Sequence, residues 1–210
     1  MVVESLSYRH ARYLSSARQL AHLPDDSGGE VAFAGRSNSG KSSALNAITE
    51  QKALARTSKT PGRTQMINLF ELDPRRRLVD LPGYGYAKVP ESVRREWNRS
   101  LERYLTRRNC LLGLILLMDV RHPLTALDEQ MLHWCASRRM PVHVLLTKCD
   151  KLSRGRAATT LRKVRQHVVA EGSASAQLFS SRTGQGVGDV RRLLDQWFAG
   201  PTADPGGAMY

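Results

Sequence analysis

Residues 35–42 read Gly35-Arg36-Ser37-Asn38-Ser39-Gly40-Lys41-Ser42, with the spacing G-x-x-x-x-G-K-[ST] that is typical of a phosphate-binding loop. The loop follows an apolar run at residues 30–34 and precedes a segment of helical periodicity. Glycines let such a loop close around a phosphate, so that backbone N–H groups and a helix amino end point at it. Lys41 would contact the β- and γ-phosphates, and the Ser42 hydroxyl would bind magnesium, which prefers oxygen ligands. We therefore expect all eight residues to contact a nucleotide.

Apolar runs of high β-propensity alternate with helical periodicity along the rest of the chain, which predicts an α/β fold. The turn at Asp73-Pro74 is too short for a crossover helix, so one edge strand should run antiparallel to the others. The sheet should be six-stranded, mostly parallel and covered by helices on both faces. The expected strands are residues 30–34, 66–72, 77–81, 111–118, 142–146 and 177–179. One helix is expected directly after Lys41, and four more are expected over residues 92–107, 127–138, 157–170 and 187–198.

The length of 210 residues fits one domain. We expect residues 1–29 to form an amphipathic helical extension packed on the domain, residues 30–199 to form the domain, and residues 200–210 to be a disordered tail rich in Pro and Gly. No segment approaches the roughly 20 apolar residues that cross a bilayer. The three cysteines lack the spacing of a disulfide framework or a zinc site. They suit a reducing cytoplasm, and we expect a cytoplasmic monomer.

The charge of the chain is strongly one-sided. Lys and Arg number 32 against 19 Asp and Glu, a difference of +13. Any single basic cluster is explained by a solvated helix face, but the total is larger than solubility requires. An excess of this size attracts polyanions, and phosphate contacts would supply affinity for RNA. The alternative partner is an anionic membrane surface. The clusters are Arg9/Arg12/Arg18, Arg75–Arg77, Arg94/Arg95/Arg99/Arg103, Arg138/Arg139 and Arg162/Lys163/Arg165.

A second motif, Asp80-Leu81-Pro82-Gly83, ends the strand expected at residues 77–81. Asp80 would therefore lie at the carboxyl edge of the sheet beside the phosphate-binding loop, where ligands bind in open α/β sheets. We expect Asp80 to bind magnesium through water. The N–H of Gly83 would approach the γ-phosphate, because glycine has no side chain in the way.

A third motif, Thr147-Lys148-Cys149-Asp150, follows the strand expected at residues 142–146 and resembles the [NT]-K-x-D sequence that reads guanine. A carboxylate at Asp150 can accept hydrogen bonds from the ring N–H and the amine of guanine, whereas adenine has no such pair of donors. A missed bond of this kind costs at least about 1–3 kcal/mol, so ATP should be rejected. This motif argues against a P-loop nucleoside kinase. Phe179-Ser180-Ser181 resembles the short segment that closes over the base.

The polar loop at residues 51–64 contains Thr60 and Thr64. A GTPase needs one threonine in this loop to complete the magnesium shell, and such loops order on GTP and loosen after hydrolysis. The residues themselves leave open which of the two threonines has this role.

Five stretches of the chain closely resemble the EngB (YihA/YsxC) family of bacterial ribosome-biogenesis GTPases. The similarity runs from about residue 15 to 198, and its most specific pieces are TPGRTQ and DLPGYGYA. The stretches are GRSNSGKS, SKTPGRTQMINLF, DLPGYGYAKVP, TKCDKL and FSSRTGQGV.

The resemblance implies a P-loop GTPase (Ras-like) fold with one GTP·Mg²⁺ site. It makes Thr64 the magnesium ligand, leaves Thr60 as a loop residue, and adds Gly62, Arg63, Gln65 and Met66 to the nucleotide contacts. It also implies a role in assembly of the large (50S) ribosomal subunit or its precursor, contact with rRNA, and a need in cell division and septation. A membrane-associated signalling GTPase is the alternative, although neither terminus has a lipidation motif.

Tyr84 stands directly after D-x-x-G, where many signalling GTPases have a glutamine that orients the attacking water. A phenol cannot take over that role, so we expect slow hydrolysis that depends on magnesium, Lys41, Thr64 and Gly83. Asn38 resembles an asparagine that coordinates potassium in relatives without the glutamine, which makes K⁺ a candidate cofactor. The alternative is that Asn38 only satisfies the backbone of the loop.

Overall fold

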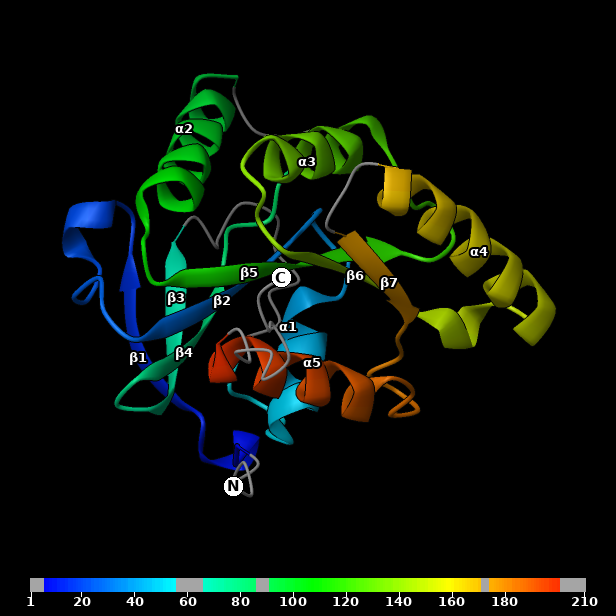
Figure 1. Cartoon of the computed structure of the whole chain (residues 1–210), viewed down its shortest axis with the longest axis horizontal. Helices are drawn as coiled ribbons and strands as arrows, with labels where there is room; N and C mark the ends of the chain where they lie inside the picture. The colour runs from blue at the N-terminus through cyan, green and yellow to red at the C-terminus, as the bar shows by residue number, and fades with distance from the viewer. Residues whose placement is uncertain (1–5, 56–65, 86–90, 171–173, 201–210) are drawn as a thin grey trace, which may run out of the picture.

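The computed structural model describes residues 6–55, 66–85, 91–170 and 174–200 and is built on a seven-stranded sheet (Figure 1). The strand order is β1-β3-β4-β2-β5-β6-β7. The strands are β1 (Arg12–Ala17), β2 (Gly29–Gly35), β3 (Ile67–Asp73), β4 (Arg76–Asp80), β5 (Leu111–Asp119), β6 (Val142–Thr147) and β7 (Ala174–Leu178). The helices are α1 (Lys41–Thr49), α2 (Glu91–Arg107), α3 (Ala126–Ser137), α4 (Arg154–Ala170) and α5 (Val187–Ala199). Among the described residues no helix has the length and apolar character that crossing a membrane requires.

Strand directions follow the prediction closely. β4, β2, β5, β6 and β7 are parallel, while β3 pairs antiparallel with β4. The mostly parallel sheet with one antiparallel strand is therefore confirmed. The sequence missed β1, which pairs antiparallel with β3 and takes the outer edge. The sheet has seven strands rather than six, and β3 lies one position in from the edge.

The prediction of an α-helical extension at residues 1–29 was wrong for the part that the structure describes. The described part of that segment contains two 3-10 turns, Tyr8–His10 and Leu20–His22, with β1 between them. Only Ala17 of β1 is buried, so this exposed edge strand has no alternation of apolar and polar residues to reveal it. The segment nevertheless contacts the domain, because the Tyr8 hydroxyl donates to Asp195 Oδ1 of α5 at 2.7 Å.

Helices cover both faces of the sheet, as predicted (Figure 1). On one face the core includes Tyr104 and Leu105 of α2, Leu132 of α3 and Val164 of α4. On the other face it includes residues of α1 and α5. The apolar strands β5 and β6 lie between the two layers, which explains their lack of alternation.

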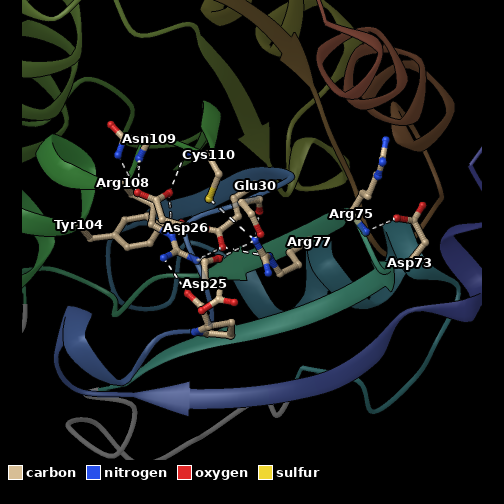
Figure 2. A network of polar contacts seen from close by, with 12 residues as sticks. Asp25, Asp26, Glu30, Asp73, Arg75, Arg77, Tyr104, Arg108, Asn109 and Cys110 are labelled. Carbon is tan, nitrogen blue, oxygen red and sulfur yellow. Dashed lines mark hydrogen bonds and ion pairs between the residues drawn. The ribbon is translucent and has the colours of Figure 1, made fainter.

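A buried charge network lies at the amino ends of β2, β4 and β5, away from the phosphate-binding loop (Figure 2). Glu30 is 0% exposed and accepts hydrogen bonds from Arg108 at 2.7 and 3.0 Å and from the Tyr104 hydroxyl at 2.8 Å. Arg77 approaches the same carboxylate at 3.1 Å. Asp26 accepts from the backbone N–H groups of residues 109 and 110 at 3.0 and 2.8 Å. Two arginines thus share one fully buried carboxylate.

This network removes one of the basic clusters expected to face RNA. Arg77 is only 8% exposed and is bound to Glu30, and Arg76 pairs with Asp73 at 2.6 Å. Of the cluster Arg75–Arg77, only Arg75 remains without an ion pair to a described residue. Formal charge therefore overstates the number of arginines that a partner can reach.

Candidate nucleotide-binding site

The phosphate-binding loop connects β2 to α1, as the sequence predicts. A Cβ atom on Gly35 would lie 2.5 Å from Ser39 Oγ and 2.7 Å from the Leu117 carbonyl oxygen, so a larger residue does not fit. Gly40 has φ +92°, in the left-handed region that favours glycine. The two glycines keep the loop closed at the amino end of α1, an arrangement suited to phosphate oxygens.

Lys41 and Asp80 bring the first two motifs together. Lys41 is the first residue of α1, Asp80 is the last of β4, and their side chains form an ion pair that is 10% and 5% exposed. An anionic phosphate suits the ammonium group, and a divalent cation suits the carboxylate. The described residues contain no group of three or more His, Cys, Asp or Glu that could hold a metal ion. Magnesium bound near Ser42 and Asp80 would therefore need oxygen ligands from phosphate and water as well.

The D-x-x-G segment runs along the phosphate-binding loop. The Tyr84 N–H donates to the Gly35 carbonyl at 3.3 Å, and the Ser37 N–H donates to the Tyr84 carbonyl at 2.9 Å. A Cβ atom on Gly83 would make only ordinary contacts, the nearest at 3.5 Å. The described protein atoms therefore leave room for a side chain at Gly83, and any requirement for glycine there must come from a ligand.

The third motif is attached to the same loop. Thr147, the last residue of β6, donates through its hydroxyl to the Ser39 carbonyl at 2.6 Å. Lys148 Nζ donates to the Asn38 carbonyl at 2.7 Å and lies 3.0 Å from Asp119 Oδ2. Asn38 has φ +63°, a conformation that asparagine adopts more readily than most residues. This geometry gives Asn38 a structural reason to be an asparagine.

Asp119 was missed by the sequence reasoning. It ends the buried strand β5 and pairs with Arg121 at 2.7 Å and with Lys148. The hydrogen bond from Arg121 lowers the pKa of Asp119 below its ordinary range, and Lys148 lowers it further. Together they outweigh the desolvation of Asp119, which by itself would raise the pKa. An Asp at the end of an apolar strand was the available signal.

Asp150, the carboxylate expected to read the base, is held in place by the segment Phe179-Ser180-Ser181. Ser180 is 0% exposed, and its hydroxyl donates to Asp150 Oδ1 at 2.7 Å. The Cys149 N–H donates to the Phe179 carbonyl at 3.2 Å, which ties the two segments together. Ser180 thus orients Asp150, whose other oxygen, Oδ2, lies 3.9 Å from Arg182 Nη1.

Comparison with known proteins agrees with this geometry. Residues 30–148 match the family described as 50S ribosome-binding GTPase. The probable GTP-binding protein EngB of Glaesserella parasuis serovar 5 is 54% identical over 195 residues, which are 92% of this chain and 93% of that protein. The protein of the same description from Escherichia coli O139:H28 is 55% identical over 196 residues, 93% of each chain. The chain belongs to the EngB family of P-loop GTPases. The family recognised from the sequence motifs is thereby confirmed.

A solved structure supports the fold. The crystal structure of a probable GTP-binding protein engB gives a TM-score of 0.66 at 18% identity, over 81% of this chain and 99% of that chain. At this identity the likeness concerns the fold alone.

Tyr84 has a specific place in this member of the EngB family. Its side chain is 7% exposed, and its hydroxyl donates to Asp128 Oδ1 at 2.9 Å. Asp128 is 1% exposed, and its Oδ2 closes the capping box of α3 by accepting from Thr125. Burial and the neighbouring Asp128 raise the pKa of Tyr84 well above its ordinary value, so the phenol stays protonated. The phenol proton is therefore donated to Asp128.

The predicted site residues differ in what they can offer a ligand. Leu81, Cys149 and Phe179 are buried, so they can meet a nucleotide only through the backbone, whereas Ser181 is exposed. Met66 and Pro82 are half-buried. Gly62, Arg63, Thr64 and Gln65, together with Thr60, lie outside the described residues, as do residues 201–210 of the expected tail.

Proposed function

We propose that this protein binds GTP with Mg²⁺, hydrolyses it slowly to GDP and phosphate, and acts as a switch in assembly of the large ribosomal subunit. One observation carries the nucleotide assignment. A phosphate-binding loop with Lys41 and a carboxylate held by Ser180 lie at the carboxyl edge of the same sheet, joined by the contact from Lys148 to the loop. The two ends match the triphosphate and the base of one ligand.

At the phosphate end, the pair Lys41–Asp80 would open when the ligand binds. The ammonium group would turn to the β- and γ-phosphates, and Asp80 would hold the magnesium ion through water, with Ser42 and Thr64 as direct ligands. Magnesium would neutralise charge on the phosphate oxygens. Gly83 would donate its N–H to the γ-phosphate, where the described side chains leave room.

At the base end, Asp150 would accept the ring N–H and amine of guanine. The hydroxyl of Ser180 already fixes one carboxylate oxygen, so the orientation needs little change on binding. The stem of Lys148 would lie along the base while its ammonium group keeps the contact with Asp119. A carboxylate positioned in this way selects guanine over adenine.

Hydrolysis should be slow without a partner. Tyr84 is committed to Asp128, and water must be oriented by other groups. Lys41 and backbone N–H groups can stabilise the charge that develops between the β- and γ-phosphates. A potassium ion beside Asn38 would add to this stabilisation.

The ribosomal part of the proposal is supported by the family description and by charge. The matched family is described as 50S ribosome-binding GTPase. The net charge of +13 favours a phosphate-rich partner such as rRNA over a neutral one. We further propose a cytoplasmic monomer, which suits three free and buried cysteines, and the family resemblance adds a need in cell division and septation.

Nucleotide competition tests the site. Wild-type protein should bind GTP and GDP and reject ATP, and Asp150→Asn should weaken GTP by roughly 10- to 100-fold while improving XTP, whose base has a carbonyl where guanine has the amine. Asp189→Asn removes a carboxylate on α5 that pairs with Arg192, and it should leave both affinities unchanged. Equal affinity of the wild type for ATP and GTP would contradict the base assignment.

Sucrose-gradient sedimentation of cell extract tests the partner. The protein should sediment with large-subunit particles, and the fraction that does so should differ between GDP and a non-hydrolysable GTP analogue. Flotation with anionic liposomes tests the membrane alternative. Sedimentation away from ribosomal particles in both nucleotide states would refute the ribosomal role and leave the nucleotide site intact.

A further inference from the structure

Four exposed arginines line one hollow on the surface between α2 and α3. Arg99, Arg103 and Arg107 follow one another at four-residue spacing on α2, so they share one side of the helix. Arg138 comes from the end of α3, which lies beside α2 on the same face of the sheet (Figure 1). The hollow has a volume of about 380 Å³ and also includes Glu102 and Thr106. We call these four arginines the α2–α3 arginine site.

The charges of this site are not balanced within the described residues. Many other arginines pair with carboxylates, as Arg76 does with Asp73 and Arg108 does with Glu30. No ion pair joins the α2–α3 arginine site to any residue of the described ranges. Arg138 instead lies 5.3 Å from the ring centroid of Trp134. Among the described residues that line the hollow, Glu102 is the only carboxylate, so four positive charges face one negative charge there.

The shape of the site suits a chain of phosphates better than a single anion. Four residues of α-helix rise about 6 Å, so the three arginines of α2 extend over about 12 Å. This is the axial length of three to four phosphates on one strand of a double helix, at about 3.4 Å per phosphate. Guanidinium groups bind phosphate oxygens through two N–H donors at once. An extended polyanion would therefore satisfy the row as a whole.

We propose that the α2–α3 arginine site binds the phosphate backbone of RNA. This inference rests on the proposed function and names the surface through which the protein meets rRNA. A membrane is the weaker occupant, because basic membrane surfaces combine charge with exposed apolar residues. The exposed large hydrophobics among the described residues are Tyr13, Leu14, Leu127 and Val169, and none of them lines the hollow.

The position of the site leaves the nucleotide site free. Its residues belong to the outer helices, whereas the nucleotide motifs lie on the loops after β2, β4 and β6. A neighbouring hollow of about 290 Å³ is lined by Tyr84 of the nucleotide side and by Glu102 and Trp134 of the arginine side. RNA and nucleotide can therefore be bound at the same time, as a switch requires.

The test compares two triple variants that remove the same charge. Arg99→Gln/Arg103→Gln/Arg107→Gln removes the α2 row, and Arg154→Gln/Arg156→Gln/Arg162→Gln removes three exposed arginines of α4. Glutamine keeps the helix propensity of arginine. Affinity for a fluorescent 20-base-pair RNA duplex is measured by anisotropy over a salt series, and co-sedimentation with purified 50S subunits is measured with GDP and with a non-hydrolysable GTP analogue.

For the α2 variant, the slope of log affinity against log salt concentration should be smaller in magnitude by about 2.7, because each lost phosphate contact removes about 0.9. Between 1 M and 0.1 M salt, each contact strengthens binding by about eightfold, so the loss of three contacts should weaken binding at 0.1 M salt by roughly 500-fold. The α4 variant should retain the wild-type slope, and Glu102→Gln should tighten binding because it removes a carboxylate that lines the hollow. GDP affinity, measured on every variant, should stay at the wild-type value and reports correct folding. The double variant Arg103→Gln/Arg107→Gln replaces the triple if that value changes.

Equal weakening by the α2 and α4 variants, or no weakening by either, would overturn the proposal. The proposal would also be overturned if the α2 variant bound RNA as tightly as the wild type but no longer bound phosphatidylserine vesicles. That result would assign the surface to a membrane. If the wild type binds 50S subunits and the α2 variant binds them equally well, the site is wrong while the ribosomal role stands. If the wild type binds the duplex through this site but ignores 50S subunits, the ribosomal role fails and the RNA surface stands.

Discussion

Replacing Glu30 with Gln is the most direct test of what stabilises this fold. Glu30 is fully buried and is shared by Arg77, Arg108 and the Tyr104 hydroxyl. Glutamine has the same shape but no charge, so both guanidinium groups lose their common counter-ion. Burial works to lower the pKa of Arg108, but the hydrogen bond and charge of Glu30 keep it raised above its ordinary value. Arginine stays protonated in proteins, so the variant cannot escape by losing a proton.

The expected cost is large. Removing one partner of a buried ion pair typically costs about 3–5 kcal/mol, because a charge is left without compensation. The whole stability of a domain is about 5–15 kcal/mol. For a chain of this size each kcal/mol shifts Tm by about 2–4 °C, so Tm should fall by roughly 6–20 °C. Tyr104→Phe removes one hydrogen bond to the same carboxylate and should cost less, about 1.5–3 kcal/mol.

Urea unfolding followed by circular dichroism measures these losses. Glu129→Gln on α3 is the matched control, because the Glu129 side chain is 51% exposed and its one ion pair to a described residue is a 4.0 Å contact with His167. It should stay within about 0.5 kcal/mol of the wild type. A loss for Glu30→Gln no larger than that of the control would refute the reasoning. GTP affinity of the folded variant should not change, since Glu30 lies near the amino end of β2 and the phosphate-binding loop follows its carboxyl end.

Three further outcomes are expected. Asn38→Ala should abolish the faster hydrolysis in K⁺ than in Na⁺ at fixed ionic strength while GDP still binds, and identical wild-type turnover in both salts would leave Asn38 with only its role in the loop. Desolvation favours the neutral form of Asp26, yet the backbone N–H groups of residues 109 and 110 lower its pKa below the ordinary range. The ionised Asp26 carboxylate therefore stabilises the fold above about pH 4, and this contribution is lost as the pH falls. Urea midpoints measured from about pH 7 to pH 2.5 should therefore fall less steeply for Asp26→Asn, and parallel curves would contradict this. Tyr84→Phe should cost about 1–3 kcal/mol in urea unfolding, because a buried oxygen of Asp128 loses its donor, with GTP turnover changed by less than about tenfold. A far larger fall in turnover would place Tyr84 in the reaction.

The motifs were readable from sequence because their chemistry fixes their spacing. A loop that closes on phosphate needs glycine where a Cβ atom does not fit, as at Gly35, and the carboxyl edge of a parallel sheet brings Asp80 and Asp150 to the same side. The predicted strands therefore placed the motifs correctly. Thr64 stays a prediction, because it lies outside the described residues.

Contacts between distant charges could not be predicted in the same way. Glu30 and Arg108 are 78 positions apart, and nothing local marks either as buried. Strand β1 escaped notice because an edge strand exposed along most of its length has no periodic apolar signal. The bond from Ser180 to Asp150 depends on how two loops meet, which only the folded chain specifies.

The hydrogen bond between Tyr84 and Asp128 has a consequence for how such a chain can evolve. The two residues are 44 positions apart, yet neither can change without altering the surroundings of the other. Introducing glutamine at position 84, the residue of many signalling GTPases, would remove the phenol that satisfies a buried carboxylate of the α3 capping box. A lineage that acquires the glutamine must therefore also replace Asp128 or accept a less stable intermediate. Among homologous chains the two positions should be substituted together, and their joint history would separate this class of GTPase from those that orient water with an amide.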